Sequence, residues 1–291
     1  MYGIINLNKP AGYTSMDCCA VIRKLCGEKK VGHTGTLDPN ATGVLPVCIG
    51  KATRLIEYMD TFPKTYLCGC RLGFSTDTHD IWGNPDEAVF DGLFPSKEAV
   101  EEALISFKGE ILQRPPAYSA VKVAGKRLYS YAREGKKVES DPRPVIIDSI
   151  ELIEYDETGG ELTFKMSCSR GTYLRSVCHE LGEKLACGGT MSSLIRTSSC
   201  GFELKDSVSL DTLRGDGVEG HLLPIERAVS AMPRIVLGDD EKRLFLNGTK
   251  GFFLDPGAPE GTVFAVFSGG ELLGTSVVKP DGEFKILKVL A

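Results

Sequence analysis

The sequence predicts an α+β fold, with a large N-terminal domain followed by a small β-rich domain. Segments with strand alternation and segments with helical periodicity follow one another without a regular βαβ repeat. Residues 211–232 combine three glycines, a proline and scattered charge, a composition typical of a domain boundary. From Pro233 onward, short apolar runs alternate with Gly and Pro turns, which predicts a small β-barrel or sandwich.

The first elements are predicted from local signals. Residues 4–10, IINLNKP, read as a short strand that ends at Pro10. The cluster Thr14, Ser15 and Asp17 predicts the start of a helix, and Gly27 predicts its end. Apolar residues of this helix recur at i, i+3, i+4 and i+7, so we expect one buried face made of Cys18, Val21, Ile22 and Leu25.

The middle of the chain alternates between strand and helix signals. Residues 64–74 alternate in polarity and predict a strand, with Tyr66, Cys68, Cys70, Leu72 and Phe74 on one face. Ser96 is a candidate cap for a helix that runs to Phe107. Residues 162–169 alternate again, and Gly171-Thr172 then begins a helix whose apolar face contains Leu174, Val177, Cys178, Leu181 and Leu185.

Composition places the chain among ordinary globular proteins. It has 291 residues, 42% of them hydrophobic and 25% charged, so we expect a sizeable core. The N-terminal stretch MYGIINLNKPAGYTS lacks a signal-peptide pattern and no long apolar run follows, so we expect a soluble protein that is not exported. The ten cysteines include no C-x-x-C pair, which favours buried reduced thiols over disulfides or a zinc site.

A net charge of −5 argues against binding polyanions through bulk charge, but the charge is unevenly distributed. Between residues 114 and 143 three tyrosines are interleaved with the basic residues Arg114, Lys122, Lys126, Arg127, Arg133, Lys136, Lys137 and Arg143. Such a mixture suits contact with phosphates and stacking on bases. A solvated, charged hairpin or helix is the alternative for this segment taken alone.

The stretch GHTGTLDPNATGVLPV, residues 32–47, holds a single carboxylate, Asp38. Asp-Pro is first a turn signal, but the prolines stiffen this loop and its glycines permit close approach by a ligand. The loop is therefore a candidate for positioning a reactive carboxylate. The following GVLPVCIGKAT has the wrong spacing for a phosphate-binding loop, and the motifs G-x-G-x-x-G, H-E-x-x-H and G-x-S-x-G do not occur.

This loop resembles the catalytic motif of the TruB family of tRNA pseudouridine synthases. Four further segments resemble family motifs and occur in the family's order over residues 4–200: INLNKPAGYTS, KTYLCGCRLGFSTDTHD, QRPPAYSAVKVAGKRLYSYAREG and SRGTYLRSV. The resemblance implies a pseudouridine synthase domain over residues 1–229, built on a mixed, largely antiparallel sheet with flanking helices. It also implies an RNA-gripping insertion at about 114–145. A PUA-like RNA-binding β-barrel is expected at 233–291.

The family's reaction implies the rest of the functional expectation. A family member isomerises uridine 55 in the T-loop of tRNA, after flipping that nucleotide out of its stack. No redox step and no external group is needed, so no cofactor and no metal is expected. The resemblance further implies a monomer that acts on the tRNA T-stem-loop in the cytoplasm, without a protein partner and without a membrane.

The resemblance also assigns roles to residues. Asp38 is the catalytic group that assists glycosidic bond cleavage and C–C rejoining. The substrate-binding positions are Lys9, His33, Tyr66, Tyr173, Arg175 and Leu194. Arg175 is the cation expected to keep Asp38 ionised in a partly dry pocket. Tyr66 is expected to stack on the flipped base, and it is a candidate for proton transfer at C5, although its alternation alone favours core packing. Lys9 is either structural or directed at the RNA.

Two other functions stay open on the residues alone. A non-catalytic RNA-binding or tRNA-folding protein would use segment 114–143 and the C-terminal domain, and would not depend on Asp38. A glycoside hydrolase would need a second carboxylate within about 5–10 Å, for which Asp77 and Asp80 are candidates. The order of chemical steps and the atom that Asp38 attacks are also open.

Overall fold

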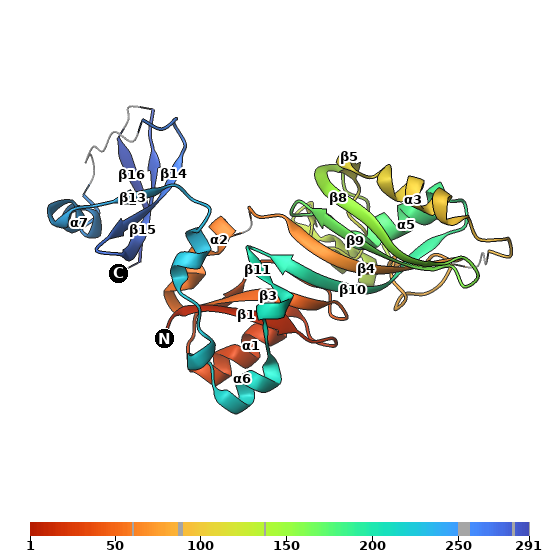
Figure 1. Cartoon of the computed structure of the whole chain (residues 1–291), viewed down its shortest axis with the longest axis horizontal. Helices are drawn as coiled ribbons and strands as arrows, with labels where there is room; N and C mark the ends of the chain where they lie inside the picture. Colours follow the sequence, from red (N-terminus) through yellow and green to blue (C-terminus); the bar gives the residue numbers. More distant parts are fainter. Residues whose placement is uncertain (60, 87–89, 137, 250–256, 281–282, 291) are drawn as a thin grey trace.

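The computed structural model describes residues 1–59, 61–86, 90–136, 138–249, 257–280 and 283–290. The predicted α+β class is confirmed: a large mixed sheet with flanking helices is joined to a smaller C-terminal sheet (Figure 1). In spatial order the main path of the large sheet is β12 (Val208–Ser209), β1 (Gly3–Lys9), β3 (Thr42–Ile49), β10 (Gly189–Ser199), β4 (Lys64–Leu72), β9 (Glu161–Cys168), β8 (Arg143–Asp156) and β5 (Gly109–Gln113).

Most neighbouring strands of this sheet are antiparallel, but β3 and β10 are parallel and pair through a short ladder, at Ile195↔Thr42 and Arg196↔Gly43. Gly43 makes this approach possible. Its φ is +102°, and a Cβ at this position would lie 2.2 Å from the Arg196 carbonyl oxygen. The short strands β2 (Val31–His33) and β11 (Phe202–Glu203) pair with β3 and β10. The two halves of the sheet therefore meet at a narrow junction beside Asp38.

The N-terminal half folds largely as predicted. Helix α1 (Ser15–Cys26) begins at a capping box between Thr14 and Asp17, and ends at Gly27 with φ 65°. Cys18 and Ile22 are buried and Val21 is half-buried, but Leu25 is 38% exposed. The prediction is wrong at Leu25. The buried residues of α1 include Ser15 and Cys19 beside Cys18 and Ile22, and none of them lies in the last helical turn, where Leu25 is found. Helix α6 (Leu210–Asp216) packs beside α1.

Two helices cover one face of the sheet at β4 and β9. They are α3 (Lys97–Ile105), capped by Ser96, and α5 (Leu174–Lys184). Their apolar faces pack on Cys68, Cys70 and Phe164, in a core that includes Tyr66. The predicted strands and helices of this region are confirmed, although β4 ends at Leu72, before Phe74, because Gly73 has φ 103°.

The basic segment forms an insertion between β5 and β8, which pair with each other. It contains a small hairpin, β6 (Lys122–Val123) and β7 (Lys126–Arg127), and the short helix α4 (Leu128–Arg133). Cations cover the tyrosine rings: Arg133 lies 5.4 Å from the Tyr129 ring and Lys126 lies 4.9 Å from the Tyr131 ring. Lys137, counted in the basic segment, lies outside the described residues.

The C-terminal domain begins with β13 (Arg234–Val236) and contains β14 (Val263–Ser268), β15 (Glu271–Val278) and β16 (Phe284–Val289). These strands pair in the order β13-β14-β15-β16, and no pairing among the described residues closes them into a barrel. Helix α7 (Asp239–Leu246) was not predicted. Its first turn is held by Gly238 N–H, which donates to the Glu241 carboxylate at 2.9 Å.

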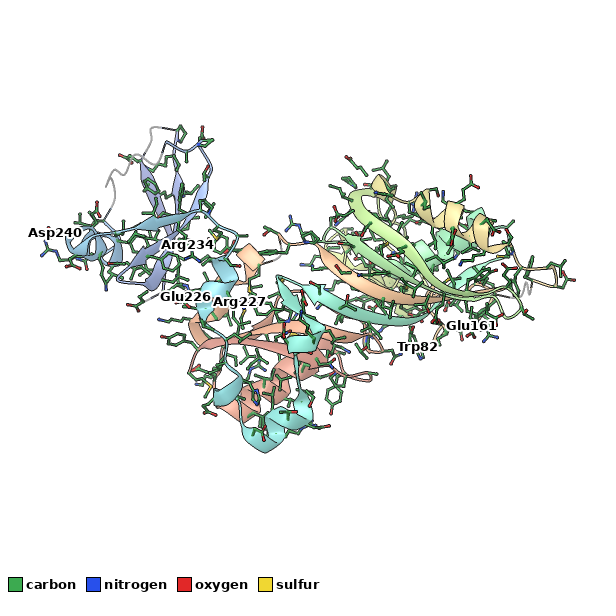
Figure 2. The ribbon with its side chains drawn as sticks, in the orientation of Figure 1. Trp82, Glu161, Glu226, Arg227, Arg234 and Asp240 are labelled. Atoms are coloured by element: carbon green, nitrogen blue, oxygen red, sulfur yellow. The ribbon has the colours of Figure 1, made fainter. Side chains whose placement is uncertain are left out.

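The large domain also contains the short helical segments η1 (Gly50–Leu55), α2 (Ile56–Met59), η2 (Leu204–Asp206), η3 (Glu219–His221) and η4 (Ile225–Val229). Of these, η1, α2 and η4 contribute buried residues to an apolar cluster shared with the C-terminal domain. One apolar cluster holds Leu55 and Met59 together with Ala265 and Phe267 of the C-terminal sheet. Arg227 lies where the two domains meet (Figure 2), donates to the Gly201 carbonyl and covers the Phe202 ring at 4.9 Å. The C-terminal domain is thus docked by burial of apolar surface.

All ten cysteines are free thiols, and all but the half-buried Cys26 are buried, as predicted. Within the described residues no helix is both long enough and apolar enough to cross a bilayer.

Candidate active site

The loop between β2 and β3 holds Asp38 in a tight turn. The Ala41 N–H donates to the Asp38 carbonyl at 3.1 Å, which closes a β-turn with Pro39 at its second position. Leu37 N–H donates to the Ser15 hydroxyl at 2.9 Å, and Gly12 N–H donates to the Pro39 carbonyl at 3.0 Å. The predicted turn is confirmed, and its backbone is tied to the start of α1.

Lys9 lies underneath this loop with no exposed surface. Its ammonium donates to the carbonyl oxygens of Pro10, Pro39 and Ala41 at 2.9, 2.8 and 2.7 Å. Burial lowers the pKa of Lys9 from its ordinary value. Because its ammonium binds three carbonyl oxygens of the protein, these contacts favour the structural alternative for Lys9, in which it holds the Asp38 loop in place; its substrate-binding role stays a prediction.

Arg175, in the first turn of α5, forms the ion pair with Asp38. Its Nε lies 2.9 Å from Asp38 Oδ2, and the Arg175 side chain is 6% exposed while that of Asp38 is 40% exposed. The guanidinium also donates to the carbonyl oxygens of Thr78 at 3.1 Å and Tyr118 at 3.0 Å. One buried cation therefore joins the Asp38 loop, the loop after β4 and the base of the insertion.

A cavity of about 540 Å³ opens beside this pair. Five of the predicted site residues line it: Asp38, Tyr66, Tyr173, Arg175 and Leu194. Tyr66 and Leu194 are 7% and 8% exposed, so they form an apolar wall facing the carboxylate. Ser119 and Ala120 of the insertion also line the cavity. The insertion, which is the segment expected to grip the RNA, therefore lies next to Asp38. The size and lining suit one flat, partly polar group.

Gln113, at the end of β5, fixes the start of α5. Its side-chain amide accepts from Tyr173 N–H at 2.7 Å and donates to the Tyr173 carbonyl at 3.1 Å. Gln113 is 1% exposed and lines the cavity. Gln113 lies in one of the segments that resemble the family, but the sequence alone gives it no role. Both of its hydrogen bonds go to the backbone of Tyr173, which lies 60 residues away in the sequence.

The loop after β4 supplies a second carboxylate near Arg175. Asp80 Oδ2 lies 4.0 Å from Arg175 Nε, and Asp80 Oδ1 accepts from the Thr78 hydroxyl at 2.7 Å. Asp77 faces away from Arg175 and instead binds Asn84, at 2.8 Å through the backbone N–H. Asp80 thus belongs to the ion cluster at Asp38, whereas Asp77 closes its own loop.

The sequence matches two protein-family models and several named relatives. The family model described as TruB family pseudouridylate synthase (N terminal domain) matches residues 23–174, and the model described as tRNA pseudouridylate synthase B C-terminal domain matches residues 175–230. The tRNA pseudouridine synthase B of Clostridium kluyveri is 39% identical over 292 residues, covering 99% of both chains. The protein of the same name from Bacillus subtilis is 44% identical over 253 residues, covering 84% of this chain and 82% of the relative.

This chain belongs to the TruB family of pseudouridine synthases.

The family's enzymes isomerise uridine to pseudouridine in tRNA, and this TruB family chain is an enzyme of that class. A solved H/ACA RNP bound to a substrate RNA containing 2′-deoxyuridine has a chain that resembles this TruB family member with a TM-score of 0.74 and 25% identity. The match covers 99% of this chain and 85% of that one. A solved Cbf5-Nop10-Gar1 complex has a chain that gives a TM-score of 0.74 at 28% identity, with the same coverage. The pseudouridine synthase fold is confirmed.

His33 lies apart from the cavity of this TruB family enzyme. It is half-buried on β2, opposite Val47 of β3, and is not among the residues that line the cavity. Burial, with a smaller contribution from Arg196, lowers the pKa of His33 and so favours the neutral ring at neutral pH. Its role as an RNA contact stays a prediction.

Besides Gln113, sequence reasoning missed two buried basic residues that line the cavity of the enzyme. Lys64 and Arg196 line the cavity, and they are 7% and 0% exposed. Arg196 donates through Nε to the Val44 carbonyl at 2.7 Å and through Nη2 to the Gly35 carbonyl at 3.2 Å. A basic residue within a strand gives no local signal for a buried position, and only the pairing of β10 with β3 and β4 reveals it.

Proposed function

We propose that this enzyme isomerises uridine 55 in the T-loop of tRNA, with Asp38 as its catalytic group. The observation that carries the proposal is the Asp38–Arg175 pair at 2.9 Å at the edge of a cavity of about 540 Å³. The relatives named tRNA pseudouridine synthase B support tRNA as the substrate. The T-loop position rests on the resemblance of the motifs.

The cavity explains why the target nucleotide must be flipped. A stacked uridine cannot reach Asp38 at the base of the loop, so the base has to leave its stack and enter the cavity. Tyr66 and Tyr173 offer aromatic faces that replace the lost stacking, and Leu194 closes the apolar wall. In this arrangement Asp38 faces the sugar while the base is held by the rings.

The ion pair gives Asp38 its chemical role. Arg175 orients the carboxylate, so that it can attack covalently or stabilise positive charge that develops at the sugar. The C1′–N1 bond breaks, the uracil turns over while it is confined by the cavity walls, and C5 bonds to C1′. The reaction requires no group beyond the nucleotide and the side chains.

The insertion and the C-terminal domain are proposed to hold the RNA outside the cavity. The insertion carries the exposed Arg127 beside the Tyr129 ring and the exposed Lys122 opposite Arg127 in the hairpin, in reach of the phosphates of the T-stem-loop. We assign residues 1–229 to the catalytic domain and 233–291 to a PUA-like RNA-binding domain. We also propose that the enzyme is a monomer that works without a protein partner, in the cytoplasm where its tRNA substrate is found.

The alternatives weighed from the sequence receive less support. A pure RNA-binding protein would have no need for a carboxylate paired with a buried arginine inside a cavity. A glycoside hydrolase would use its second carboxylate as an acid or a nucleophile. Asp80, the nearest described candidate, instead shares Arg175 with Asp38 and accepts a hydrogen bond from Thr78.

The test uses an unmodified tRNA transcript, with pseudouridine mapped by position and RNA affinity measured on the same samples. We expect the wild type to form pseudouridine at position 55 and Asp38→Asn to bind RNA but form none. Asp211→Asn is the matched control, because Asp211 is an exposed carboxylate paired with Arg214 on α6. Product formation by Asp38→Asn at the wild-type rate, or wild-type product at another nucleotide only, refutes the proposal.

A further inference from the structure

Among the described residues, Arg196 is the largest side chain with no exposed surface. Within the described residues its guanidinium bonds only to backbone carbonyl oxygens, at Val44 and Gly35, and its Nη1 makes no hydrogen bond. A buried cation that lacks a carboxylate partner is costly, since it loses hydration without a compensating charge. Such a residue needs an explanation that packing does not provide.

The position of Arg196 in the sheet supplies that explanation. Arg196 on β10 lies directly opposite Tyr66 on β4, so both side chains project from the same face of the sheet. Both line the cavity beside Asp38. Burial raises the pKa of Tyr66, and the positive charge of Arg196 acts against that rise. The Arg196 guanidinium, whose Nη1 makes no hydrogen bond, therefore lies on the same face of the sheet as the Tyr66 phenol, beside the cavity.

We propose that Arg196 is a positioning residue for Tyr66: its guanidinium holds the Tyr66 hydroxyl at the cavity and stabilises the phenolate that removes the proton from C5. The inference rests on the proposed function, in which the uracil enters this cavity. Once C5 has bonded to C1′, the C5–H bond breaks and its proton passes to the Tyr66 oxygen. The electron pair of the C5–H bond forms the C5=C6 bond, the π pair of the C6=N1 bond moves to N1, and N1 takes up a proton from water.

The other charged or titratable groups around Tyr66 do not replace this cation. Asp38 faces Tyr66 across the cavity and disfavours the phenolate, as does the Cys168 thiol on neighbouring β9. Lys64 precedes Tyr66 on the same strand and also lines the cavity, but it does not count among the groups that shift the Tyr66 pKa. Arg196 is therefore the cation that acts directly on Tyr66.

The experiment measures single-turnover pseudouridine formation between pH 6 and 9.5 for Arg196→Met, Tyr66→Phe and the double variant. Loss of a general base costs about 10²–10⁴-fold in rate, so we expect Arg196→Met to be about 10²-fold slow at pH 7. Its deficit should shrink as pH rises, because hydroxide restores the phenolate. The double variant should be no slower than Tyr66→Phe, since both changes remove the same function.

A purely structural role of Arg196 predicts different results. The deficit of Arg196→Met would then be the same at every pH, and its effect would multiply with that of Tyr66→Phe; either result overturns the inference. Arg143→Met is the control, because Arg143 is an exposed cation at the cavity, and its loss should weaken RNA binding without altering the pH dependence. RNA affinity and thermal unfolding are measured for every variant.

Two further comparisons keep the outcome clear. If Arg196→Met does not fold, Arg196→Lys retains the charge, and its pH profile must differ from that of the wild type in the same direction but less; a parallel profile overturns the inference. Full activity of Tyr66→Phe overturns it as well. Neither of these outcomes changes the test of the proposed function, which depends on pseudouridine formation by the wild type and by Asp38→Asn. Failure of the Arg196 inference can therefore be told apart from failure of the proposed function.

Discussion

Replacing His79 tests how the loop after β4 responds to acid. The His79 ring stacks on His179 with 3.9 Å between centroids, and its backbone is left-handed with φ 60°. Burial, followed by the charges of His179 and Arg175, lowers the pKa of His79 from 6.5 to about 4. The unfolded chain therefore takes up a proton at His79 between about pH 6.5 and pH 4, while the folded protein does not.

The sign and size of the effect follow by linkage. Since one pKa unit corresponds to about 1.4 kcal/mol, the neutral state of His79 contributes up to about 3 kcal/mol to the free energy of unfolding. This contribution is complete above pH 6.5, declines as pH falls and is lost below about pH 4. His79→Asn tolerates the left-handed backbone and removes the titration, so its stability should depend less on pH in this window.

The assay is urea unfolding of wild type and variant at pH 7.5, 5.5 and 4.5, followed by circular dichroism. His221→Asn is the control, because His221 lies in η3 and pairs with Asp216, far from this loop in sequence. The difference in the free energy of unfolding between wild type and His79→Asn should become smaller by up to about 3 kcal/mol from the highest to the lowest pH. If the difference in the free energy of unfolding were the same at all three pH values, the pKa of His79 would not be lowered by folding, and the prediction would be refuted.

Three further predictions concern the loop, the sheet junction and the insertion. Lys9→Met removes the ammonium that binds three carbonyl groups, including the buried one of Ala41, so we expect the free energy of unfolding in urea to fall by about 2–4 kcal/mol and the single turnover to slow; wild-type stability would contradict this. Gly43→Ala should destabilise by at least about 2 kcal/mol, since its Cβ would meet the Arg196 carbonyl, and an unchanged urea midpoint would be inconsistent with that contact. Lys122→Ala should weaken RNA binding and lower the slope of log K against log salt by about 1, whereas exposed Lys29→Ala should leave both unchanged.

The sequence predicted the elements whose signals are local. Thr14, Asp17 and Gly27 mark the ends of α1 through their own side chains and backbone, and alternation marks β4 and β9. The Asp38 turn was likewise readable from Asp-Pro. Resemblance to a family, rather than periodicity, singled out Tyr66, Tyr173 and Leu194, because on pattern alone they read as core or helix start.

The rest depends on pairings between distant segments. Arg196 is buried because β10 lies between β3 and β4, and no local pattern encodes that order. The three carbonyl partners of Lys9 come from its own neighbour and from a loop about 30 residues on, so its burial could not be predicted from a lysine before a proline. Helix α7 was missed because it has only eight residues, of which the first three are acidic.

The ion pair at the cavity also has a consequence for folding kinetics. Asp38 and Arg175 are separated by 137 positions, and Arg175 also binds segments near Thr78 and Tyr118. Closing such long loops is slow compared with forming helices or hairpins. Catalytic competence therefore arises only after all four segments have met, and a refolding chain regains helical signal before it regains turnover.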